Sequence, residues 1–504
     1  MGKHKSIVLV TVDCLRADHV GFMGYARPTT PFIDTLAAES FVVPSAIVAG
    51  APTYYSFPAI LASRYPLIMG RDVLGPAPGE PTLASTLKKA GYATAAFGAA
   101  NPYVSSRFGY EDGFNEFRDF LSDAPAPLTD SPTNDVRGSG WKSRLNRRLE
   151  RARPAMGPLR LVYDELYFRY CQRVTPVADS LDALRRFPAA DLIVDEACNW
   201  LSSVGEAPFF LWLHLMDPHS PYYPKDAALR LMGHGPVEPY RARYLNSYWN
   251  RSDLGPRRLA RHRDEIIELY DAGIRWVDTQ MARLVEMLRN AKRWENCILA
   301  FTADHGEEFL DHGGRYHPPS RLTEELIHVP LLLRVPGYTK TEVTKAPFSL
   351  LHIAPTLLDA AELAIPRAFQ GCSYWPQVRQ GTGFDSVAIS ESVASCTNPF
   401  RRENRLGPRV LSVREERYKL VLHFEPPAED LYDLEADPGE QAPLAPSAQH
   451  PARRRLLEVA HAHLQCSIGR RDERARLRAR LREVQLEWRK PADKASSTVS
   501  QPAR

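Results

Sequence analysis

The chain has 504 residues, of which 44% are hydrophobic and 25% are charged, and its formal net charge is +4. This length suits a large folded core, and the near balance of acids and bases argues against a nucleic-acid partner. The seven cysteines are scattered, odd in number and without a CxxC pair. The composition therefore predicts neither a thiolate zinc site nor a disulfide framework.

The first expected element is a strand over residues 6–12, SIVLVTV, which ends at Asp13. Its β-branched and apolar residues are typical of a strand that is covered on both faces. The basic start is followed by too short an apolar run for a signal peptide, and no stretch reaches the roughly 18 apolar residues of a membrane span. We therefore expect no signal peptide, no transmembrane segment and a cytoplasmic location.

Helical and strand patterns then alternate along the chain. This alternation predicts an α/β fold with a mostly parallel central sheet and helices on both faces. The long pattern over Asp264–Arg289 has apolar residues at helical spacing and predicts an amphipathic helix. Further strands are expected over residues 41–46, 94–97, 209–215, 297–302 and 329–335, and further helices over 32–39, 83–90, 189–201 and 351–360.

The stretch Ala51–Pro66, APTYYSFPAILASRYP, carries hydroxyls at Thr53 and Ser56 ahead of a helix expected from Pro58. Unpaired N–H groups and the helix dipole favour an anion at a helix N-terminus. A hydroxyl held beside such an anion could serve as a nucleophile for phosphoryl or sulfuryl transfer. The ordinary alternative is that one of these hydroxyls only caps the helix.

The composition changes twice along the chain. Leu121–Arg153 is rich in proline and acid and then strongly basic, which predicts an exposed insert. From Ala388 the alternation predicts a small antiparallel sheet, and Ala452–Arg489 indicates charged helices whose thin apolar set could support an oligomer. We expect a catalytic domain over 1–380, a small C-terminal subdomain over 381–448 and a charged helical tail with a disordered end over 449–504.

Asp13 and the pair Asp304-His305 each follow a predicted strand. In a parallel sheet the carboxyl ends of the strands form the ligand-binding edge. Together with Thr53, these groups would hold one divalent cation, and the ligand types do not separate Mn, Mg, Ca and Zn. A second metal is possible. Taken singly, each residue could equally be a helix cap or a structural histidine.

The sequence resembles the sulfatase family of the alkaline phosphatase superfamily over about residues 6–445. The blocks that carry the resemblance include IVLVTVDCLRADHVGFMGY, TTPFIDTLAAES, APTYYSFPAILASRYP, WLHLMDPHSPYYP, FTADHGEEFLDHG and ELIHVPLLLRVPG. The resemblance implies a divalent metal at Asp13, Asp304 and His305 together with the nucleophile. It also implies a substrate-facing histidine at His219.

His317 follows the Asp-His-Gly block and stands where related phosphodiesterases and transferases keep a catalytic or metal-binding histidine. His312 competes for that role, and we prefer His317. The family's Gly-Lys-Trp-His block is GAAN here, which ends at Asn101, and Cys14 replaces the second aspartate of the opening pair. We expect Cys14 to be a buried, neutral thiol beside the metal, although a thiolate ligand stays open.

The formylglycine motif C/S-x-P-x-R of true sulfatases is absent. Alignment on Arg-Tyr-Pro places Thr53 at the nucleophile position, with Tyr55 and Phe57 where the proline and arginine belong. A rival register that starts at Ser56 supplies a serine and a proline but has Ile60 in place of arginine. A threonine cannot become formylglycine, which favours phosphorus over sulfur chemistry.

The sequence thus predicts a metal-dependent hydrolase in which Thr53 attacks a phosphodiester, phosphonate or phosphomonoester and forms a covalent phospho-enzyme. His219 or His317 would protonate the leaving group. The expected substrate is a small-molecule, glycan or lipid ester, with Ser56, Asn101 and His312 as substrate-binding residues. Three alternatives stay open: a sulfatase without formylglycine, a phospho-head-group transferase and an inactive binding homologue.

Overall fold

The computed structural model describes residues 4–71, 73–122, 159–338, 345–382, 386–445 and 450–467. Most of the expected insert, from residue 123 on, lies outside the described residues, as does the tail from residue 468 on. Among the residues that are described, no helix combines the length and the apolar character needed to cross a membrane.

In the part of the chain that the structure describes, the central sheet has eight strands and is mostly parallel, as the alternating pattern predicts. Only the strand over residues 328–334 runs antiparallel to both of its neighbours. The strands in sheet order are β10 (Phe348–Ser349), β2 (Phe41–Ile47), β9 (His328–Arg334), β6 (Cys297–Ala303), β1 (Ser6–Val12), β5 (Phe209–Leu215), β3 (Ala93–Gly98) and β4 (Glu116–Arg118).

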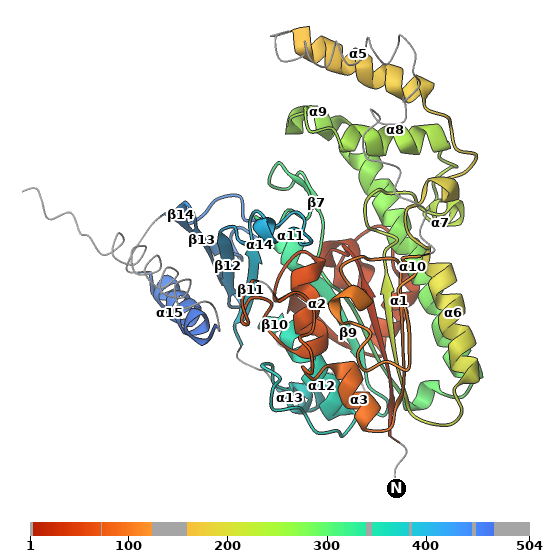
Figure 1. Cartoon of the computed structure of the whole chain (residues 1–504), viewed down its shortest axis with the longest axis vertical. Helices are drawn as coiled ribbons and strands as arrows, with labels where there is room; N and C mark the ends of the chain where they lie inside the picture. The colour runs from red at the N-terminus through yellow and green to blue at the C-terminus, as the bar shows by residue number, and fades with distance from the viewer. Residues whose placement is uncertain are drawn as a thin grey trace, which may run out of the picture.

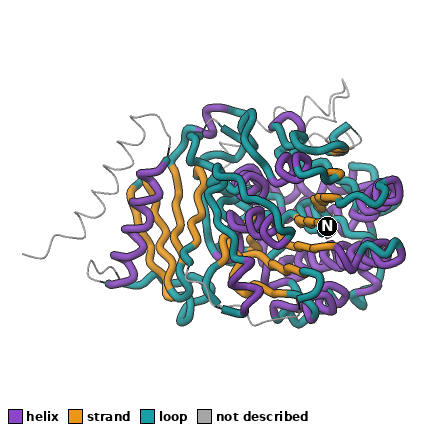
Figure 2. Tube along the Cα trace, turned by 90° about the horizontal axis from the view of Figure 1, so that it is seen from below, coloured by secondary structure: helices purple, strands orange, loops and turns teal. Residues whose placement is uncertain are grey.

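Helices cover both faces of this sheet (Figures 1 and 2). One layer contains α2 (Thr53–Ala62), α3 (Leu83–Lys89) and α12 (Ile353–Ala360), and the other contains α1 (Pro31–Ala38), α6 (Ala190–Ser203) and α10 (Arg263–Asn290). The other α-helices within the described residues are α5 (Leu159–Val174), α7 (Asp226–Leu231), α8 (Pro239–Trp249), α9 (Pro256–Leu259), α11 (Glu324–Ile327), α13 (Trp375–Gln380), α14 (Arg402–Arg405) and α15 (Pro451–Cys466).

Strand β1 lies in the middle of the sheet, and all seven of its residues are buried. It pairs in parallel with β5 on one side and with β6 on the other. The pair Val12 and Ala303 is the last in register between β1 and β6. The residues that follow, Asp13 and Asp304, therefore leave the sheet side by side at its carboxyl edge.

A second, antiparallel sheet follows the central one, in agreement with the alternation after Ala388. Helix α15 packs on this sheet through buried apolar residues that include Leu456, Leu457 and Leu464. The described part of the predicted tail helix thus packs its apolar side against the antiparallel sheet of the same chain. The strands are β11 (Ala388–Val393), β12 (Arg409–Arg414), β13 (Tyr418–Phe424) and β14 (Pro427–Asp433).

Helix α2 begins five residues earlier than the proline suggests, because its first residue is Thr53 and Pro58 lies inside it. A proline within a helix removes one backbone hydrogen bond, which burial of neighbouring side chains can offset. All ten residues of α2 are buried, and the helix continues past Pro58 to Ala62. Thr53 therefore stands at the helix N-terminus, and Ser56 lies one turn further in.

The packing of α15 can be tested through Leu456, which is 1% exposed. We expect Leu456→Ala to lower the free energy of unfolding by about 2–5 kcal/mol, because it leaves a cavity between α15 and the antiparallel sheet. Urea denaturation monitored by circular dichroism measures this loss. The exposed neighbour Arg454 provides the control, since Arg454→Ala is expected to change stability by less than about 0.5 kcal/mol. Equal stability of the two variants would contradict the packing.

Candidate active site

Two carboxylates and one imidazole meet at the carboxyl edge of β1 and β6. Asp13, Asp304 and His305 are each 0% exposed. Nε2 of His305 lies 3.6 Å from Oδ1 of Asp13 and 3.6 Å from Oδ2 of Asp304. The three metal ligands that the sequence predicts are therefore brought together in one buried cluster.

The orientation of His305 is fixed by the backbone. Its Nδ1 lies 2.9 Å from the carbonyl oxygen of Gly306, which assigns the ring proton to Nδ1. Nε2 consequently directs a lone pair at the two carboxylates and accepts a hydrogen bond from Oγ1 of Thr53 at 3.1 Å. Metal-binding histidines are commonly held in this way, with the second ring nitrogen on a carbonyl.

These residues fit a divalent cation. Oδ2 of Asp304 is buried and has no hydrogen-bond partner among the described residues. The N···O separations of 3.6 Å are too long for hydrogen bonds but suit ligands that each lie about 2.0–2.2 Å from a shared ion. The predicted set Asp13, Asp304, His305 and Thr53 is thus a suitable cage for one cation.

The two carboxylates differ in their electrostatics. Burial acts to raise the pKa of Asp13, but His219, His214 and His305 outweigh it and hold the pKa well below the ordinary value. Burial, together with the neighbouring charge of Asp13, raises the pKa of Asp304. A cation between them would remove this repulsion and keep both groups ionised.

The second oxygen of Asp13 is held by two polar side chains. Nδ2 of Asn101 donates to Oδ2 of Asp13 at 2.8 Å, and Nε2 of His214 lies 3.4 Å from the same oxygen. Asn101 was predicted to bind substrate, and here it contacts Asp13. His214 was missed, because one histidine in the strand FFLWLHL resembles a core residue. Its register opposite Thr11, two residues before Asp13, is the signal that could have identified it.

Ser56 lies next to the cluster but points at the backbone. Its hydroxyl donates to the carbonyl oxygen of Asp304 at 2.6 Å and is 0% exposed. This contact ties helix α2 to the end of β6 and so positions Thr53 beside His305. The substrate-binding role expected for Ser56 stays a prediction. The contact that the structure describes has a different effect, because it holds helix α2 in place.

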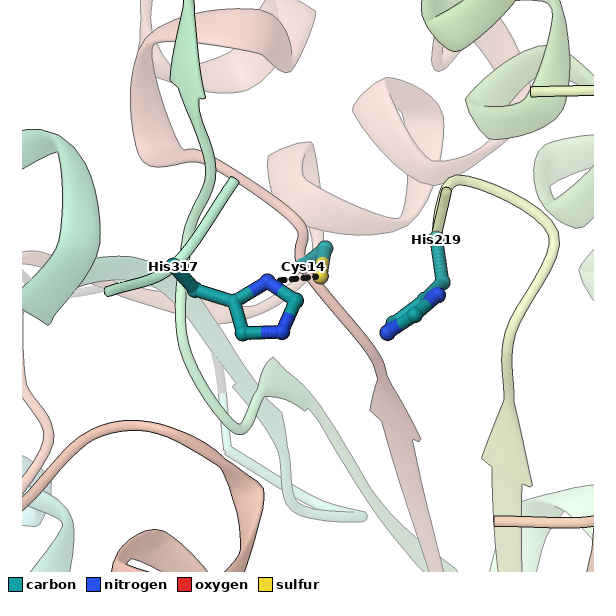
Figure 3. A group of neighbouring side chains, drawn as sticks. All are labelled: Cys14, His219 and His317. Carbon is teal, nitrogen blue, oxygen red and sulfur yellow. Dashed lines mark hydrogen bonds between the residues drawn. The ribbon is translucent and has the colours of Figure 1, made fainter. Parts of the chain in front are cut away.

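His219 and His317 face each other across Cys14 (Figure 3). The centroids of their rings are 5.2 Å apart, and the ring of His317 is 4.6 Å from that of His305. Nδ1 of His317 lies 3.3 Å from the carboxylate of Glu307, a residue that the sequence analysis did not single out. Burial acts to raise the pKa of Glu307, but His317 and His219 lower it below the ordinary value.

Cys14 is a buried thiol, as expected. Its Sγ donates to Oδ1 of Asp13 at 3.1 Å and lies 3.4 Å from Nδ1 of His317. Burial and the carboxylates of Glu307, Asp13 and Asp304 raise its pKa well above the ordinary value. The thiol is therefore protonated as long as no cation binds to it.

His312 lies in a separate network. Its Nδ1 is 3.0 Å from Glu325 and its Nε2 is 3.2 Å from the carbonyl oxygen of Glu440. Between His312 and His317, the structure brings only His317 into the Asp13 cluster. Substrate binding by His312 is untested, and its described contacts join the segment after β7 (Glu308–Phe309) to Glu440.

A mostly parallel sheet with paired carboxylates and a helix-terminal hydroxyl at its carboxyl edge is the arrangement that the sequence resemblance leads us to expect. The family model for sulfatases matches residues 5–363, and the model for the C-terminal part of N-sulphoglucosamine sulphohydrolase matches residues 315–464. The chain therefore belongs to the sulfatase family. This confirms the predicted resemblance, the fold class and the expected enzyme class, a hydrolase of phosphate or sulfate esters.

Individual relatives are distant. An arylsulfatase from Clostridium perfringens is 24% identical over 490 residues, which are 89% of this chain and 92% of that protein. Arylsulfatase K from Gallus gallus is 27% identical over 167 residues, 32% of this chain, and the match covers only 30% of that relative.

Solved structures support the fold. A phosphonate monoester hydrolase of Agrobacterium radiobacter has a TM-score of 0.59 at 19% identity and covers 92% of this chain and 95% of its own. A protein solved with its substrate D-glucosamine-2-N,6-O-disulfate has a TM-score of 0.62 at 16% identity. The match covers 92% of this chain and 98% of that protein's chain. The fold is therefore shared by proteins named for sulfur and for phosphorus chemistry.

The His312 network predicts a pH dependence of stability. The hydrogen bond that His312 Nδ1 donates to the Glu325 carboxylate raises the pKa of His312 to about 9, above the value of about 6.5 in the unfolded chain. The stabilisation that protonated His312 adds to the free energy of unfolding is thus fully present below about pH 6.5, and it is lost as the pH rises through about 9. We expect His312→Gln to lower the free energy of unfolding by about 1–2 kcal/mol at pH 6 and by much less at pH 10.

Urea unfolding of wild type and His312→Gln at the two pH values measures this difference. In a Glu325→Gln background the same substitution should lose most of its pH dependence, because the stabilising charge is gone. An equal effect of His312→Gln at both pH values would show that protonation of His312 does not stabilise the fold.

Proposed function

We propose that this protein is a metal-dependent phosphoester hydrolase in which the Thr53 hydroxyl is the nucleophile. The observation that carries the proposal is the place of Thr53 at the N-terminus of α2, with Oγ1 3.1 Å from Nε2 of His305 and beside the buried carboxylates. A hydroxyl at this position can be deprotonated and can attack an anion held at the sheet edge.

The divalent cation belongs with Asp13, Asp304, His305 and Thr53, since these donors fit one. When bound, it neutralises the charge of the ester oxygens and acidifies the hydroxyl that it contacts. His214 and Asn101 hold the second oxygen of Asp13 and so keep the carboxylate in place.

The chain's own groups account for the rest of the reaction. The Thr53 hydroxyl loses its proton to solvent, and Oγ1 forms a bond to phosphorus as the bond between phosphorus and the leaving oxygen breaks in line with it. His219 or His317 gives a proton to the leaving oxygen, and Glu307 holds His317 in orientation through Nδ1. Water then attacks the phosphorus of the phospho-threonine, which releases the phosphoryl group as free phosphate, phosphate monoester or phosphonate and restores the Thr53 hydroxyl.

Phosphorus is favoured over sulfur by the residue at the nucleophile position. Formylglycine is made from a cysteine or serine, whereas residue 53 is a threonine with an additional methyl group. The similarity to phosphonate monoester hydrolases is compatible with this choice. Sulfate-ester hydrolysis is the second candidate, because the family model and several relatives carry the name sulfatase.

The proposed substrate is a small-molecule, glycan or lipid ester. One structurally similar protein was solved with a sulfated glucosamine, and others are phosphonate monoester hydrolases. Arg186 lines a small pocket together with His219 and Tyr223, beside Arg185, which is paired with Asp217; the positive charge of Arg186 would favour an anionic substrate on the His219 side of the cluster.

Substitution of Thr53 tests the nucleophile. We expect Thr53→Ala to lower kcat/KM on the best phosphorus substrate by about 10⁴-fold or more, because the attacking oxygen is removed. Thr53→Ser keeps a hydroxyl and should retain measurable turnover. A panel of phosphodiester, phosphonate, phosphomonoester and sulfate esters gives the rates, and mass spectrometry after rapid quenching should find a phosphoryl group on residue 53.

Ser56→Ala is the matched control, since Ser56 is the nucleophile in the rival register. It should lower turnover far less than Thr53→Ala does. Full activity of Thr53→Ala combined with an inactive Ser56→Ala would assign the reaction to Ser56. A higher kcat/KM for sulfate than for every phosphorus ester would favour the second candidate.

Metal removal tests the cage. We expect a chelator to abolish turnover and to lower the melting temperature, because a cation that binds only the folded chain stabilises it. Re-addition of the divalent ion should restore both.

Asp304→Asn should weaken binding of the ion, measured by calorimetry, while Asp278→Asn should leave it unchanged. Asp278 is also buried, but it accepts hydrogen bonds from the backbone of α1. Unchanged turnover and metal content after chelation and dialysis would contradict this cage.

A further inference from the structure

Helix α5 presents a row of large apolar side chains to solvent. The row consists of four residues at intervals of four positions, which places them along one side of the helix: Val162, Leu166, Tyr170 and Val174. Each of them is between 43% and 61% exposed. An apolar row on a helix normally packs against a neighbour, and contiguous exposed apolar surface marks places where another molecule binds.

The opposite side of α5 is already packed against the protein. The ring of Phe168 lies 5.5 Å from the ring of Tyr244 and 6.0 Å from that of Tyr248, both on α8. The guanidinium of Arg251 lies 4.6 Å from the centre of the Phe168 ring. In Figure 1, α5 lies at one end of the molecule, and α8 and α9 separate it from the central sheet. The apolar row therefore faces away from the core.

Two arginines share the outer side of the helix. Arg169 and Arg173 stand seven positions after Val162 and Leu166, which is about two helical turns, so they lie on the same face. The side chain of Arg169 is 67% exposed, and Arg173 is exposed as well. The outer face of α5 thus combines apolar side chains with positive charge.

The acid beside this face does not cancel that charge. Glu165 accepts from Arg169 at 3.0 Å, from Arg251 at 2.8 Å and from Arg258 at 3.0 Å. Arg251 also pairs with Asp253 at 2.7 Å. This group holds three guanidiniums and two carboxylates, so its net charge is positive before Arg173 is added.

The sequence that precedes α5 adds more positive charge. Residues 137–153, RGSGWKSRLNRRLERAR, contain seven Lys or Arg and one Glu. Six positions join residue 153 to residue 159, so at most about 20 Å of chain separates this basic stretch from the start of the helix. The stretch lies outside the described residues and is not part of the surface, but its charge stays close to α5.

This combination suits an anionic lipid surface. Apolar side chains enter the boundary between headgroups and acyl chains, while guanidiniums on long stems reach the phosphates. A second copy of the chain is a poorer match. Pairing two such faces would bring Arg169 and Arg173 of one copy against the same residues of the other, and like charges across an interface repel.

We propose that the outer face of α5 docks on an anionic lipid surface. The helix has 16 residues and is about 24 Å long, so it would lie flat along the interface and not cross the bilayer. The residues that make up this outer face are Val162, Leu166, Arg169, Tyr170, Arg173 and Val174.

This inference goes beyond the proposed function, which concerns the cluster at the edge of the central sheet. Lipid binding can be measured without turnover, and Thr53→Ala should bind vesicles as the wild type does. A failure of the Thr53 mechanism therefore leaves this test valid, and a failure of lipid binding leaves the mechanism untouched.

The experiment sediments the full chain with phosphatidylcholine vesicles that contain or lack phosphatidylserine. We expect binding to the anionic vesicles only, and we expect added NaCl to weaken it, because salt screens the attraction between arginines and headgroups. The triple variant Val162→Ser, Leu166→Ser, Val174→Ser should lower the partition coefficient by about 10-fold or more, since less apolar surface leaves water. Arg169→Gln combined with Arg173→Gln should lower it by roughly 10-fold and reduce its salt dependence.

A matched control removes three exposed apolar side chains from other parts of the surface. Leu192, Leu231 and Leu406 are 43%, 48% and 54% exposed and lie outside α5. The triple variant Leu192→Ser, Leu231→Ser, Leu406→Ser should bind anionic vesicles as the wild type does. Circular dichroism verifies that every variant is folded.

Absence of wild-type binding to anionic vesicles would overturn the proposal, as would an equal loss of binding in the two triple variants. Sedimentation velocity tests the other occupant. A concentration-dependent dimer that the α5 triple variant abolishes, in a chain that does not bind vesicles, would assign this face to a second copy.

Discussion

The parallel pairing of β1 with β6 is the constraint on which the site depends. Because Val12 and Ala303 are the last residues in register, Asp13 and Asp304 must leave the sheet next to each other. Both are fully buried, and two like charges in a water-excluded place repel strongly. Burial and, after it, this repulsion raise the pKa of Asp304, and a nearby cation is the simplest physical means of relieving both.

The neighbours of the two aspartates extend the same arrangement outward. His305 follows Asp304 and meets Thr53, while the Asp304 carbonyl receives the hydroxyl of Ser56 and so anchors helix α2. Cys14 follows Asp13 and turns toward the imidazole of His317.

Sequence patterns predicted the strands, the long helix and the antiparallel sheet well, since burial on both faces leaves apolar runs of recognisable period. They were less accurate at helix α2, where Pro58 suggested a start five residues late. His214 and Glu307 escaped notice for a related reason. A histidine in an apolar strand and a second acid in a charged turn carry no local signal, and only the register with β1 and the fold of the following loop bring them to the site.

The sequence by itself determined which residues end the strands, that threonine rather than cysteine stands at position 53, and that the chain resembles the sulfatase family. These properties are local, because they depend on residue identity and on periodicity. Only the tertiary structure decided which of these residues meet. It brought His317 to Cys14 and placed His312 against Glu325, although five positions separate the two histidines. The physical reason is that side-chain contact depends on how distant segments pack, which neither spacing nor composition encodes.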